Sequence, residues 1–183
     1  MTNTFRALPA FLPGVHLLEP RQFTDARGSF VKTYHDATWA GASLYFTPRE
    51  EYYSISHRGV LRGMHFQIPP HDHVKVVYCP SGRVMDVLLD LRRNSPTFGQ
   101  CMAQELSAEN RLILFIPAGL AHGFLSLEDR TVMVYKATIV HSPAHDAGVR
   151  WNSFGFKWEH AAPVVSDRDA AFPALADFAS PFD

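Results

Sequence analysis

Residues 74–140 read VKVVYCPSGRVMDVLLDLRRNSPTFGQCMAQELSAENRLILFIPAGLAHGFLSLEDRTVMVYKATIV, and this stretch decides the fold class. It contains short apolar runs without helical periodicity, at residues 74–79, 83–91, 101–106, 112–116, 123–126 and 131–140. Turn-forming sequences separate them, namely Pro80-Ser81-Gly82, Arg93-Asn94-Ser95-Pro96, Ala108-Glu109-Asn110 and Pro117-Ala118-Gly119. Many short strands at close spacing predict an all-β protein, an antiparallel sandwich or barrel.

The flanking segments predict few helices. A helical turn is expected at residues 38–42, and the C-terminal region 160–183 is expected to be a loop with one short helix near residues 167–170. A chain of 183 residues can bury roughly two-thirds of its unfolded surface without help from disulfides or metals. Because no repeat, linker or composition shift divides the chain, we predict a single domain over residues 1–183.

Charge and composition exclude several classes of partner. The chain has 17 basic and 18 acidic residues and a net charge of -1, so it lacks the long-range attraction that nucleic-acid or membrane binding uses. Two cysteines do not make a disulfide framework. Residues 1–20 do not read as a secretory signal, and no apolar run approaches the roughly 20 residues that span a bilayer. We therefore expect a cytoplasmic protein. Its unusual feature is ten histidines.

The segment Arg58-Gly59-Val60-Leu61-Arg62-Gly63-Met64-His65-Phe66 combines residue types that suit chemistry on a phosphorylated substrate. Arginine offers a planar fork for phosphate, and histidine can move a proton near neutral pH. Glycine permits backbone conformations that other residues disfavour. On its own, however, the segment fits equally well an ordinary strand with solvated arginines and a hydrogen-bonded histidine.

Two further segments look like the signature motifs of the cupin double-stranded β-helix. They are Pro69-Pro70-His71-Asp72-His73-Val74-Lys75 and Pro117-Ala118-Gly119-Leu120-Ala121-His122-Gly123-Phe124. Metal-binding cupins use a His-x-His pair, a glutamate shortly after it and a histidine of the second motif. Here the glutamate is missing and Lys75 stands nearby, where its charge repels a metal cation. We expect no metal, and the alternative is a metal site formed by His71, His73 and His122.

Read together, many segments in order resemble the dTDP-4-dehydrorhamnose 3,5-epimerase family. The resemblance runs from about Gly14 to Pro173. It rests on Arg58–Phe66, the Lys75 strand, Gly82–Val84, Asp86–Arg92, Ser95–Gly99, Leu106–Asn110, Ile116–Phe124, Tyr135-Lys136, Gly148–Asn152 and Ser166–Asp169. It implies a cupin jelly roll with few short helices and no metal or other cofactor. It also implies a homodimer in which an N-terminal segment, about residues 1–35, reaches toward the partner's site.

The resemblance assigns roles to individual residues. His65 matches the family's catalytic base, Asp169 its paired carboxylate, Tyr135 the general acid and Lys75 the lysine near the sugar carbonyl. Arg62 and His122 match residues that contact the diphosphate. Arg27 and Phe30 match the N-terminal motif, which here reads Asp25-Ala26-Arg27-Gly28-Ser29-Phe30.

These roles suit the chemistry of a 4-ketosugar. Removing the hydrogen at C3 or C5 leaves an enolate with its charge largely on O4, which a fixed cation can stabilise. A histidine oriented by a carboxylate can remove the proton, and inversion then needs a donor on the opposite face. The implied function is epimerisation at C3, C5 or both of a nucleotide-linked 4-keto-6-deoxyhexose. The product would serve deoxysugar synthesis, for example for a surface polysaccharide such as the lipopolysaccharide O-antigen.

Four positions depart from the family pattern as we align it. They are Lys32, where the family commonly has glutamate, Glu50 and Tyr52, where glutamine and asparagine are common, and His73, where glutamine is common. In the family these positions line the nucleotide and outer sugar region. A CDP- or GDP-linked 4-ketosugar is therefore an alternative substrate.

Three other functions stay open at this point. A metal-dependent cupin isomerase or oxygenase would use the histidines named above. A 3,4-ketoisomerase would form the same enolate but move the carbonyl. A sugar-nucleotide binding module without turnover is disfavoured, because a mere binder does not need both an acid and a base.

Overall fold

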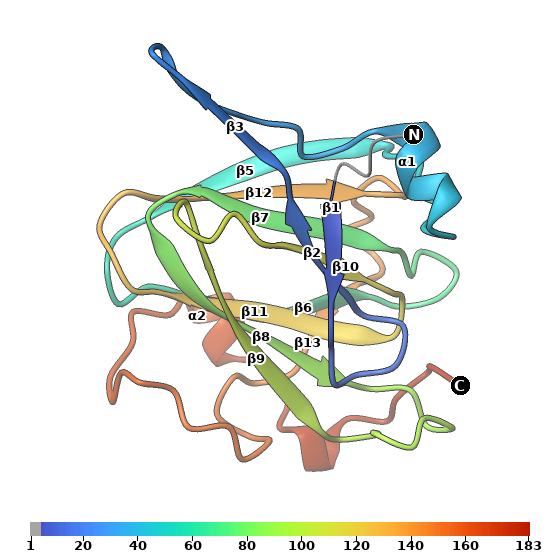
Figure 1. Ribbon diagram of the computed structural model, residues 1–183. Helices are drawn as coiled ribbons and strands as arrows, with labels where there is room; N and C mark the ends of the chain where they lie inside the picture. Colours follow the sequence, from blue (N-terminus) through green and yellow to red (C-terminus); the bar gives the residue numbers. More distant parts are fainter. Residues whose placement is uncertain (1–4) are drawn as a thin grey trace.

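The protein is built from two antiparallel sheets that lie face to face. The computed structural model describes residues 5–183 (Figure 1). One sheet has the strand order β1-β2-β10-β7-β12-β5 and the other β13-β6-β11-β8-β9. The first sheet consists of β1 (Phe5–Leu8), β2 (His16–Pro20), β10 (Ile113–Ile116), β7 (Lys75–Ser81), β12 (Thr131–Ala137) and β5 (Glu50–Ser56). The second consists of β13 (Asp146–Gly148), β6 (Leu61–Gln67), β11 (Leu120–Ser126), β8 (Arg83–Asp90) and β9 (Cys101–Ser107). This arrangement confirms the predicted all-β jelly roll.

All six apolar runs of residues 74–140 form strands. The main differences lie at the ends: β11 begins at Leu120, three residues before the predicted start, and β12 ends at Ala137. The strands outside this stretch are less apolar, as in β5, which reads EEYYSIS and forms the edge of its sheet. Strand β5 can be polar because nearly all of its side chains are exposed or half-buried.

Apolar side chains fill three layers, which explains why the runs are continuous and not alternating. Between the sheets lie residues such as Val77, Leu88 and Phe124. The outer face of the six-stranded sheet is covered by Trp39 and its aromatic neighbours. The outer face of the other sheet is covered by the C-terminal segment, with Phe182 packed in the same cluster as β6 and β8 residues. Strands buried on both faces are apolar at successive positions.

Two short helices and one 3-10 turn complete the fold. Helix α1 spans Asp36–Gly41, two residues earlier than the predicted turn at 38–42, because the His35 side chain caps its first turn at Thr38. Helix α2 spans Asp167–Ala170 as predicted. The 3-10 turn η1 at Leu175–Asp177 was not predicted. None of the helices within residues 5–183 has the length and apolar character needed to cross a bilayer.

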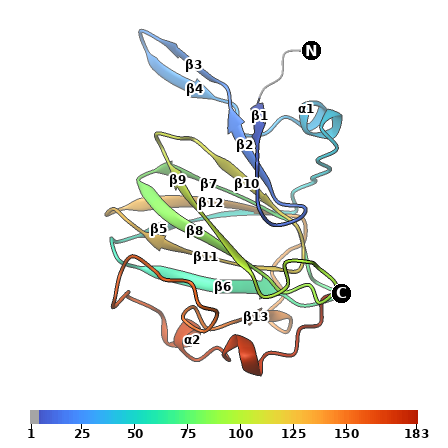
Figure 2. The ribbon, with the colours of Figure 1, turned by 60° about the horizontal axis from the view of Figure 1, so that its bottom comes forward.

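The N-terminal region divides into two parts. Strands β1 and β2 pair within the chain's own six-stranded sheet. Strands β3 (Gln22–Asp25) and β4 (Gly28–Val31) form a separate hairpin that projects from the body (Figure 2). Phe23 and Phe30 on this hairpin are 48% and 60% exposed, which is unusual for phenylalanine.

Candidate active site

Two connected cavities open between the sheets. The inner chamber, of about 180 Å³, is lined by Tyr52, Ser54, Arg62, His65, Lys75, His122, Phe124 and Tyr135. The outer chamber, of about 360 Å³, is lined by Glu50, Tyr52, His65, Phe66, Gln67, His73, Lys75, Ala137, Ile139, His141, Asp146 and Arg168. Tyr52, His65 and Lys75 line both chambers, so the two chambers adjoin at these residues.

Strand alternation explains much of this lining. Successive side chains of a strand point to opposite faces, so Glu50, Tyr52 and Ser54 of β5 share one face. Tyr135 of β12 is directly opposite Val77 of β7, and Lys75 lies two positions before Val77 on the same face of β7. Tyr135 and Lys75 therefore share one face of the sheet. The six-stranded sheet thus turns its polar side chains into the chambers at one end and its apolar ones into the core at the other.

Strand β6 departs from alternation at Gly63. Arg62 and His65 are an odd number of positions apart, yet both line the inner chamber. Gly63 has φ +140°, and a Cβ placed there would lie 2.5 Å from the Cα of Gly123 on β11. The register of β6 and β11 shifts at the same place. Only glycine permits this backbone path, which brings the arginine and the histidine to one face.

His65 and Asp169 form a hydrogen-bonded pair although 104 positions separate them in the chain. His65 Nε2 lies 2.8 Å from Asp169 Oδ1, and Asp169 Oδ2 accepts from the Gly63 amide at 3.0 Å. Burial would raise the pKa of Asp169, but the hydrogen bonds, first that of His65, hold it below its ordinary value. The carboxylate can only accept, so His65 Nε2 donates and Nδ1 keeps the lone pair.

The C-terminal segment delivers Asp169 to this position. Val164 pairs with the backbone on both sides of Val60, through its hydrogen bonds to Gly59 and Leu61. Ser166 then caps helix α2 by accepting from the Asp169 amide at 3.1 Å. The helix therefore starts at a fixed point beside β6, with the Asp169 side chain 5% exposed.

A glycine and a phenylalanine that sequence reasoning missed orient the His65 ring. Phe172 meets His65 edge to face, with ring centroids 5.7 Å apart. Gly148, paired with His65 across β13 and β6, leaves the space for Phe172, because a Cβ there would lie 2.3 Å from that ring. Burial lowers the pKa of His65 more than Asp169 raises it, so the ring is neutral at pH 7.

Tyr135 faces this pair from the other sheet. Its hydroxyl lies 3.1 Å from Ser54 Oγ, and its ring stacks on Tyr52 and meets the edge of His122. Burial raises the pKa of Tyr135, an effect that the Ser54 hydrogen bond only partly offsets. The phenol is therefore protonated across the physiological pH range.

Lys75 lines both chambers and contacts His65. Its Nζ donates to the His65 backbone oxygen at 3.3 Å. Burial lowers the pKa of Lys75 to about 8, although Asp146 and Asp86 act in the opposite direction. The amine is therefore charged at pH 7 and placed where both chambers meet.

The two predicted diphosphate ligands have different surroundings. Arg62 donates through Nε to Ser56 Oγ at 3.1 Å and remains exposed at the inner chamber. His122 is 4% exposed and lies deep in the same chamber, with Nε2 2.8 Å from Asp86 Oδ2. The structure thus brings both to the site and holds His122 rigidly by a buried carboxylate.

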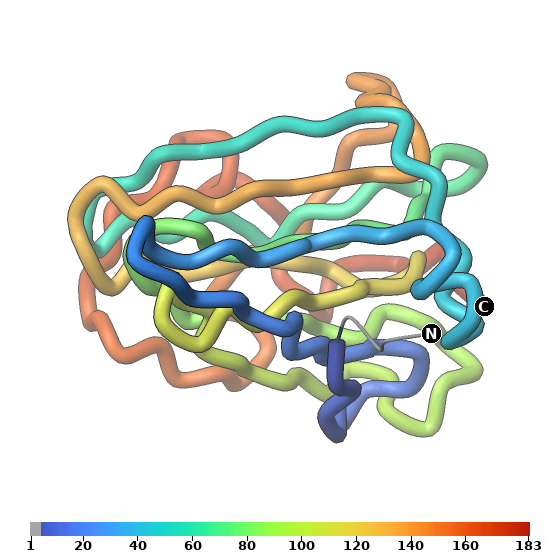
Figure 3. The backbone as a smooth tube through the Cα atoms, turned by 45° about the horizontal axis from the view of Figure 1, so that its top comes forward, coloured from blue at the N-terminus to red at the C-terminus, as the bar shows by residue number. Residues whose placement is uncertain are grey.

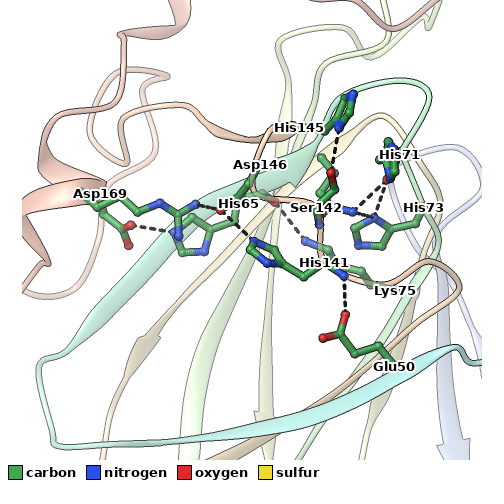
Figure 4. A network of polar contacts seen from close by, with 12 residues as sticks. Glu50, His65, His71, His73, Lys75, His141, Ser142, His145, Asp146 and Asp169 are labelled. Carbon is green, nitrogen blue, oxygen red and sulfur yellow. Dashed lines mark hydrogen bonds and ion pairs between the residues drawn. The ribbon is translucent and has the colours of Figure 1, made fainter.

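The outer chamber holds a polar network shown in Figure 4. Asp146 Oδ2 lies 2.6 Å from Arg168 and 3.2 Å from His141 Nε2, while Glu50 accepts from the His141 amide at 2.7 Å. Burial lowers the pKa of His73 to about 4, so its ring is neutral. The sequence analysis did not identify Asp146, His141 and Arg168 as members of this network. Only Arg168 had a signal in the sequence, which is its position next to Asp169.

Three predicted substrate contacts lie away from both chambers. Arg27 and Phe30 are exposed on the β3–β4 hairpin, where Arg27 is bound to Asp25, and Lys32 follows directly after β4. Within one chain, none of them lines either chamber. Glu50, Tyr52 and His73, the other unusual positions, do line the outer chamber.

The three histidines of the alternative metal site do not converge. His71 stacks on His145 at 4.1 Å and lines neither chamber, and His122 is bound to Asp86. His73 Nδ1 lies 3.1 Å from both Gln67 Nε2 and the His71 oxygen. Over residues 5–183 no three histidine, cysteine or acidic side chains are grouped as metal ligands would be. The arrangement does not favour a metal-dependent cupin.

Comparison with known proteins places this site in a family. The family model described as dTDP-4-dehydrorhamnose 3,5-epimerase matches residues 9–177. The dTDP-4-dehydrorhamnose 3,5-epimerase of Salmonella typhimurium is 41% identical over 170 residues, which cover 90% of this chain and 92% of that protein.

Solved structures agree with the match in sequence. The dTDP-4-dehydrorhamnose 3,5-epimerase of Bacillus anthracis, with TDP and PPi bound, has a TM-score of 0.91 at 35% identity, covering 93% of this chain and 99% of that one. ChmJ, a 3'-monoepimerase from Streptomyces bikiniensis in complex with dTDP-quinovose, has a TM-score of 0.87 at 32% identity, covering 92% and 87%. The jelly roll is thus the cupin-like fold of these epimerases, and the chain belongs to the dTDP-4-dehydrorhamnose 3,5-epimerase family.

Proposed function

We propose that the chain inverts C3 and C5 of a dTDP-linked 4-keto-6-deoxyhexose through an enolate. As a member of its family the chain is an isomerase that acts on a nucleotide sugar. The observation that supports the residue roles is that His65 and Tyr135 stand on opposite sheets and line the same inner chamber as Lys75. An epimerase needs a base and an acid on opposite faces of the same carbon, and this geometry supplies both.

In the proposed first step His65 removes the proton next to the carbonyl. Its Nδ1 carries the free lone pair, and Asp169 stabilises the imidazolium that forms. The electron pair of the broken C–H bond moves to the sugar oxygen O4, where Lys75 provides a positive charge. Such preorganised charge stabilisation usually contributes more to catalysis than any other single effect.

In the proposed second step Tyr135 protonates the enolate carbon from the other face. The raised pKa of its phenol keeps the proton in place until a strongly basic carbanion-like carbon develops. The phenolate that forms then regains a proton from solvent, and the His65 imidazolium releases its proton to solvent, so that both groups return to their starting states. Repetition at the second carbon completes a double inversion.

The remaining chamber residues are proposed to bind the nucleotide. Arg62 is exposed at the inner chamber and has a guanidinium suited to bidentate phosphate contacts. Glu50, His73 and Arg168 line the outer chamber, where the base and its sugar would lie. We favour thymidine because the related structures from Bacillus anthracis and Streptomyces bikiniensis hold TDP and dTDP-quinovose. A cytoplasmic location and a role in surface-polysaccharide synthesis stay predictions.

Deuterium uptake from solvent tests the proposed reaction. With dTDP-4-keto-6-deoxyglucose in D₂O, we expect the protein to incorporate deuterium at C3 and C5, detected by NMR and mass spectrometry. Uptake at C3 alone would identify a monoepimerase, and uptake with a shifted carbonyl a ketoisomerase. Parallel reactions with the CDP and GDP forms test the nucleotide. Binding of all three without any uptake would contradict the proposal.

We further propose that the β3–β4 hairpin completes the site of a second copy in a homodimer. The hairpin carries three of the predicted substrate contacts but lies outside both chambers of its own chain. It exposes two phenylalanines, which an isolated chain would leave in water. A second copy that receives the hairpin would cover these rings and gain the cation of Arg27.

Mixing two inactive variants tests this arrangement. We expect Arg27→Ala and His65→Asn homodimers to be weakly active or inactive. Co-folded in equal amounts, they should recover about a quarter of wild-type activity, because half of the dimers are mixed and each mixed dimer has one intact site. Co-folded His65→Asn and Asp169→Asn should recover none, since both changes lie in one chain's part of the site. Absence of recovery in the first mixture would show that the hairpin does not act across the dimer.

A further inference from the structure

Tyr52 is the residue in closest aromatic contact with the proposed proton donor. Strands β5 and β12 run side by side, as the teal and orange tubes of Figure 3 show, and Tyr52 and Tyr135 are directly opposite each other in the register. Their ring centroids are 4.8 Å apart with an angle of 13° between the planes. Aromatic rings at this distance attract one another, and neither can rotate without displacing the other.

Besides the stack, Tyr135 belongs to the buried core cluster between the sheets and makes one hydrogen bond and one further aromatic contact. Its hydroxyl lies 3.1 Å from Ser54 Oγ, a single contact that permits rotation of the ring about the Cβ–Cγ bond. On a second side the ring meets His122, at 6.2 Å and 66°. His122 is itself held by Asp86, so it forms a fixed wall. Tyr52 packs against a face of the Tyr135 ring and is the more exposed member of the stack.

Tyr52 also controls how Tyr135 is exposed. Its ring lines both chambers and is 44% exposed, whereas Tyr135 is only 8% exposed. The stack therefore shields the phenol from the outer chamber. Without the Tyr52 ring, water could reach the donor and the Tyr135 ring could tilt into the vacated space.

We propose that Tyr52 is a positioning residue that holds Tyr135 in line with the enolate carbon. This inference rests on the proposed function, because it assigns Tyr52 a part in reprotonation and none in proton removal. His65, on the opposite sheet, is oriented by Asp169 and Phe172 and does not depend on the stack. Misplacing a reacting group by about 1 Å can cost about a hundredfold in rate, so a modest tilt has a measurable effect.

The consequence is a change in how the enolate is consumed. The enolate can regain a proton from His65, which returns the substrate, or from Tyr135, which inverts the carbon. In D₂O the first route gives deuterated substrate, provided the histidine proton exchanges with solvent, and the second gives deuterated product. The ratio of product to deuterated substrate measures the competence of the donor independently of substrate affinity.

The test compares Tyr52→Leu with conservative and control variants. We expect Tyr52→Leu to lower the ratio about tenfold, the effect of losing one favourable aromatic stack. Tyr52→Phe keeps the ring and should stay within about twofold of wild type. Tyr135→Phe, which lacks the proton, should give deuterated substrate with almost no product. Tyr53→Leu, a change on the opposite face of the same strand where Tyr53 is 68% exposed, should leave the ratio unaltered.

Tyr52→Val provides a second test, because valine favours strands and keeps the fold of β5 if leucine does not. Equal losses of deuterated substrate and product, or a rise in KM with an unaltered ratio, would overturn the proposal and make Tyr52 a binding residue. A low ratio in Tyr52→Phe would also overturn it, since the hydroxyl and not the ring would then be responsible. Absence of all deuterium uptake in the wild-type protein would instead contradict the proposed function.

Discussion

Replacing His65 with asparagine is expected to abolish deuterium uptake at both C3 and C5. Asparagine cannot accept a proton from carbon, and its shorter side chain also lacks the Nε2 group that lies 2.8 Å from Asp169. Loss of a general base costs about a hundredfold to ten-thousandfold in rate. NMR of the recovered substrate in D₂O measures the effect directly, because no enolate forms without this step.

A second histidine variant serves as the control for His65→Asn. His57→Asn changes an exposed histidine that lines neither chamber, so its uptake rate should equal that of the wild type. Binding of dTDP by both variants would show that the sites are folded. Uptake at either carbon by His65→Asn, at more than a few per cent of the wild-type rate, would mean that another group removes that proton.

Replacing Lys75 with methionine should have the second largest effect. Methionine has a similar length without the charge, so the enolate oxygen loses its cation. Removing one such preorganised stabilising group typically lowers kcat by about a hundredfold to a thousandfold. Deuterium uptake and product formation should fall together, in contrast to the Tyr52 variants, because Lys75 stabilises the enolate that both routes share. A fall in product alone would contradict this role.

The pH dependence of the rate should reflect the ionisation of His65 and Lys75. Burial lowers the pKa of His65 below its ordinary value, so the rate should decrease only when the pH falls below about 6.5. Burial lowers the pKa of Lys75 to about 8, so the rate should decrease again as the pH rises through that value and the charge is lost. In Lys75→Met the alkaline decrease should be absent from the residual activity.

Lys75 should also reduce the stability of the fold. In an unfolded chain the pKa of lysine is about 10.4, whereas the pKa of Lys75 in the folded chain is about 8. The unfolded state therefore binds the proton more tightly. The resulting loss in the free energy of unfolding is largest below pH 8 and decreases as the pH rises toward the pKa of lysine in the unfolded chain. At pH 7, Lys75→Met should need more denaturant to unfold than the wild type while turning over less substrate. Equal midpoints would show that the amine is well solvated.

The strands and the proposed proton-transfer residues were accessible from the sequence for different reasons. The apolar runs of residues 74–140 become strands because they are bounded by turn sequences and buried on both faces. His65, Lys75, Tyr135 and Asp169 were identified by resemblance to a family, and nothing in their local sequence separates them from ordinary strand or loop residues. Period-two alternation even places Arg62 and His65 on opposite faces.

Several features could not be read from the chain. The irregularity at Gly63 needs the partner glycine at position 123, which belongs to another strand. The space that Gly148 leaves for Phe172 is likewise a contact between two segments. The Tyr52 stack depends on the pairing register of β5 and β12. Each of these is a property of two distant segments and of the backbone distance between them, which a one-dimensional pattern does not contain.

The sequence by itself determined the all-β class and the family, because burial periodicity, turn residues and ordered motifs are local properties of the chain. The tertiary structure alone decided which residues meet: the pair of His65 and Asp169, the opposing Tyr135, and the position of the hairpin outside its own site. The physical reason is that a site requires groups that are distant in the chain to lie close together in space. The capped C-terminal helix brings Asp169 within 2.8 Å of His65, and the packing of the two sheets brings Tyr135 to the chamber that His65 also lines.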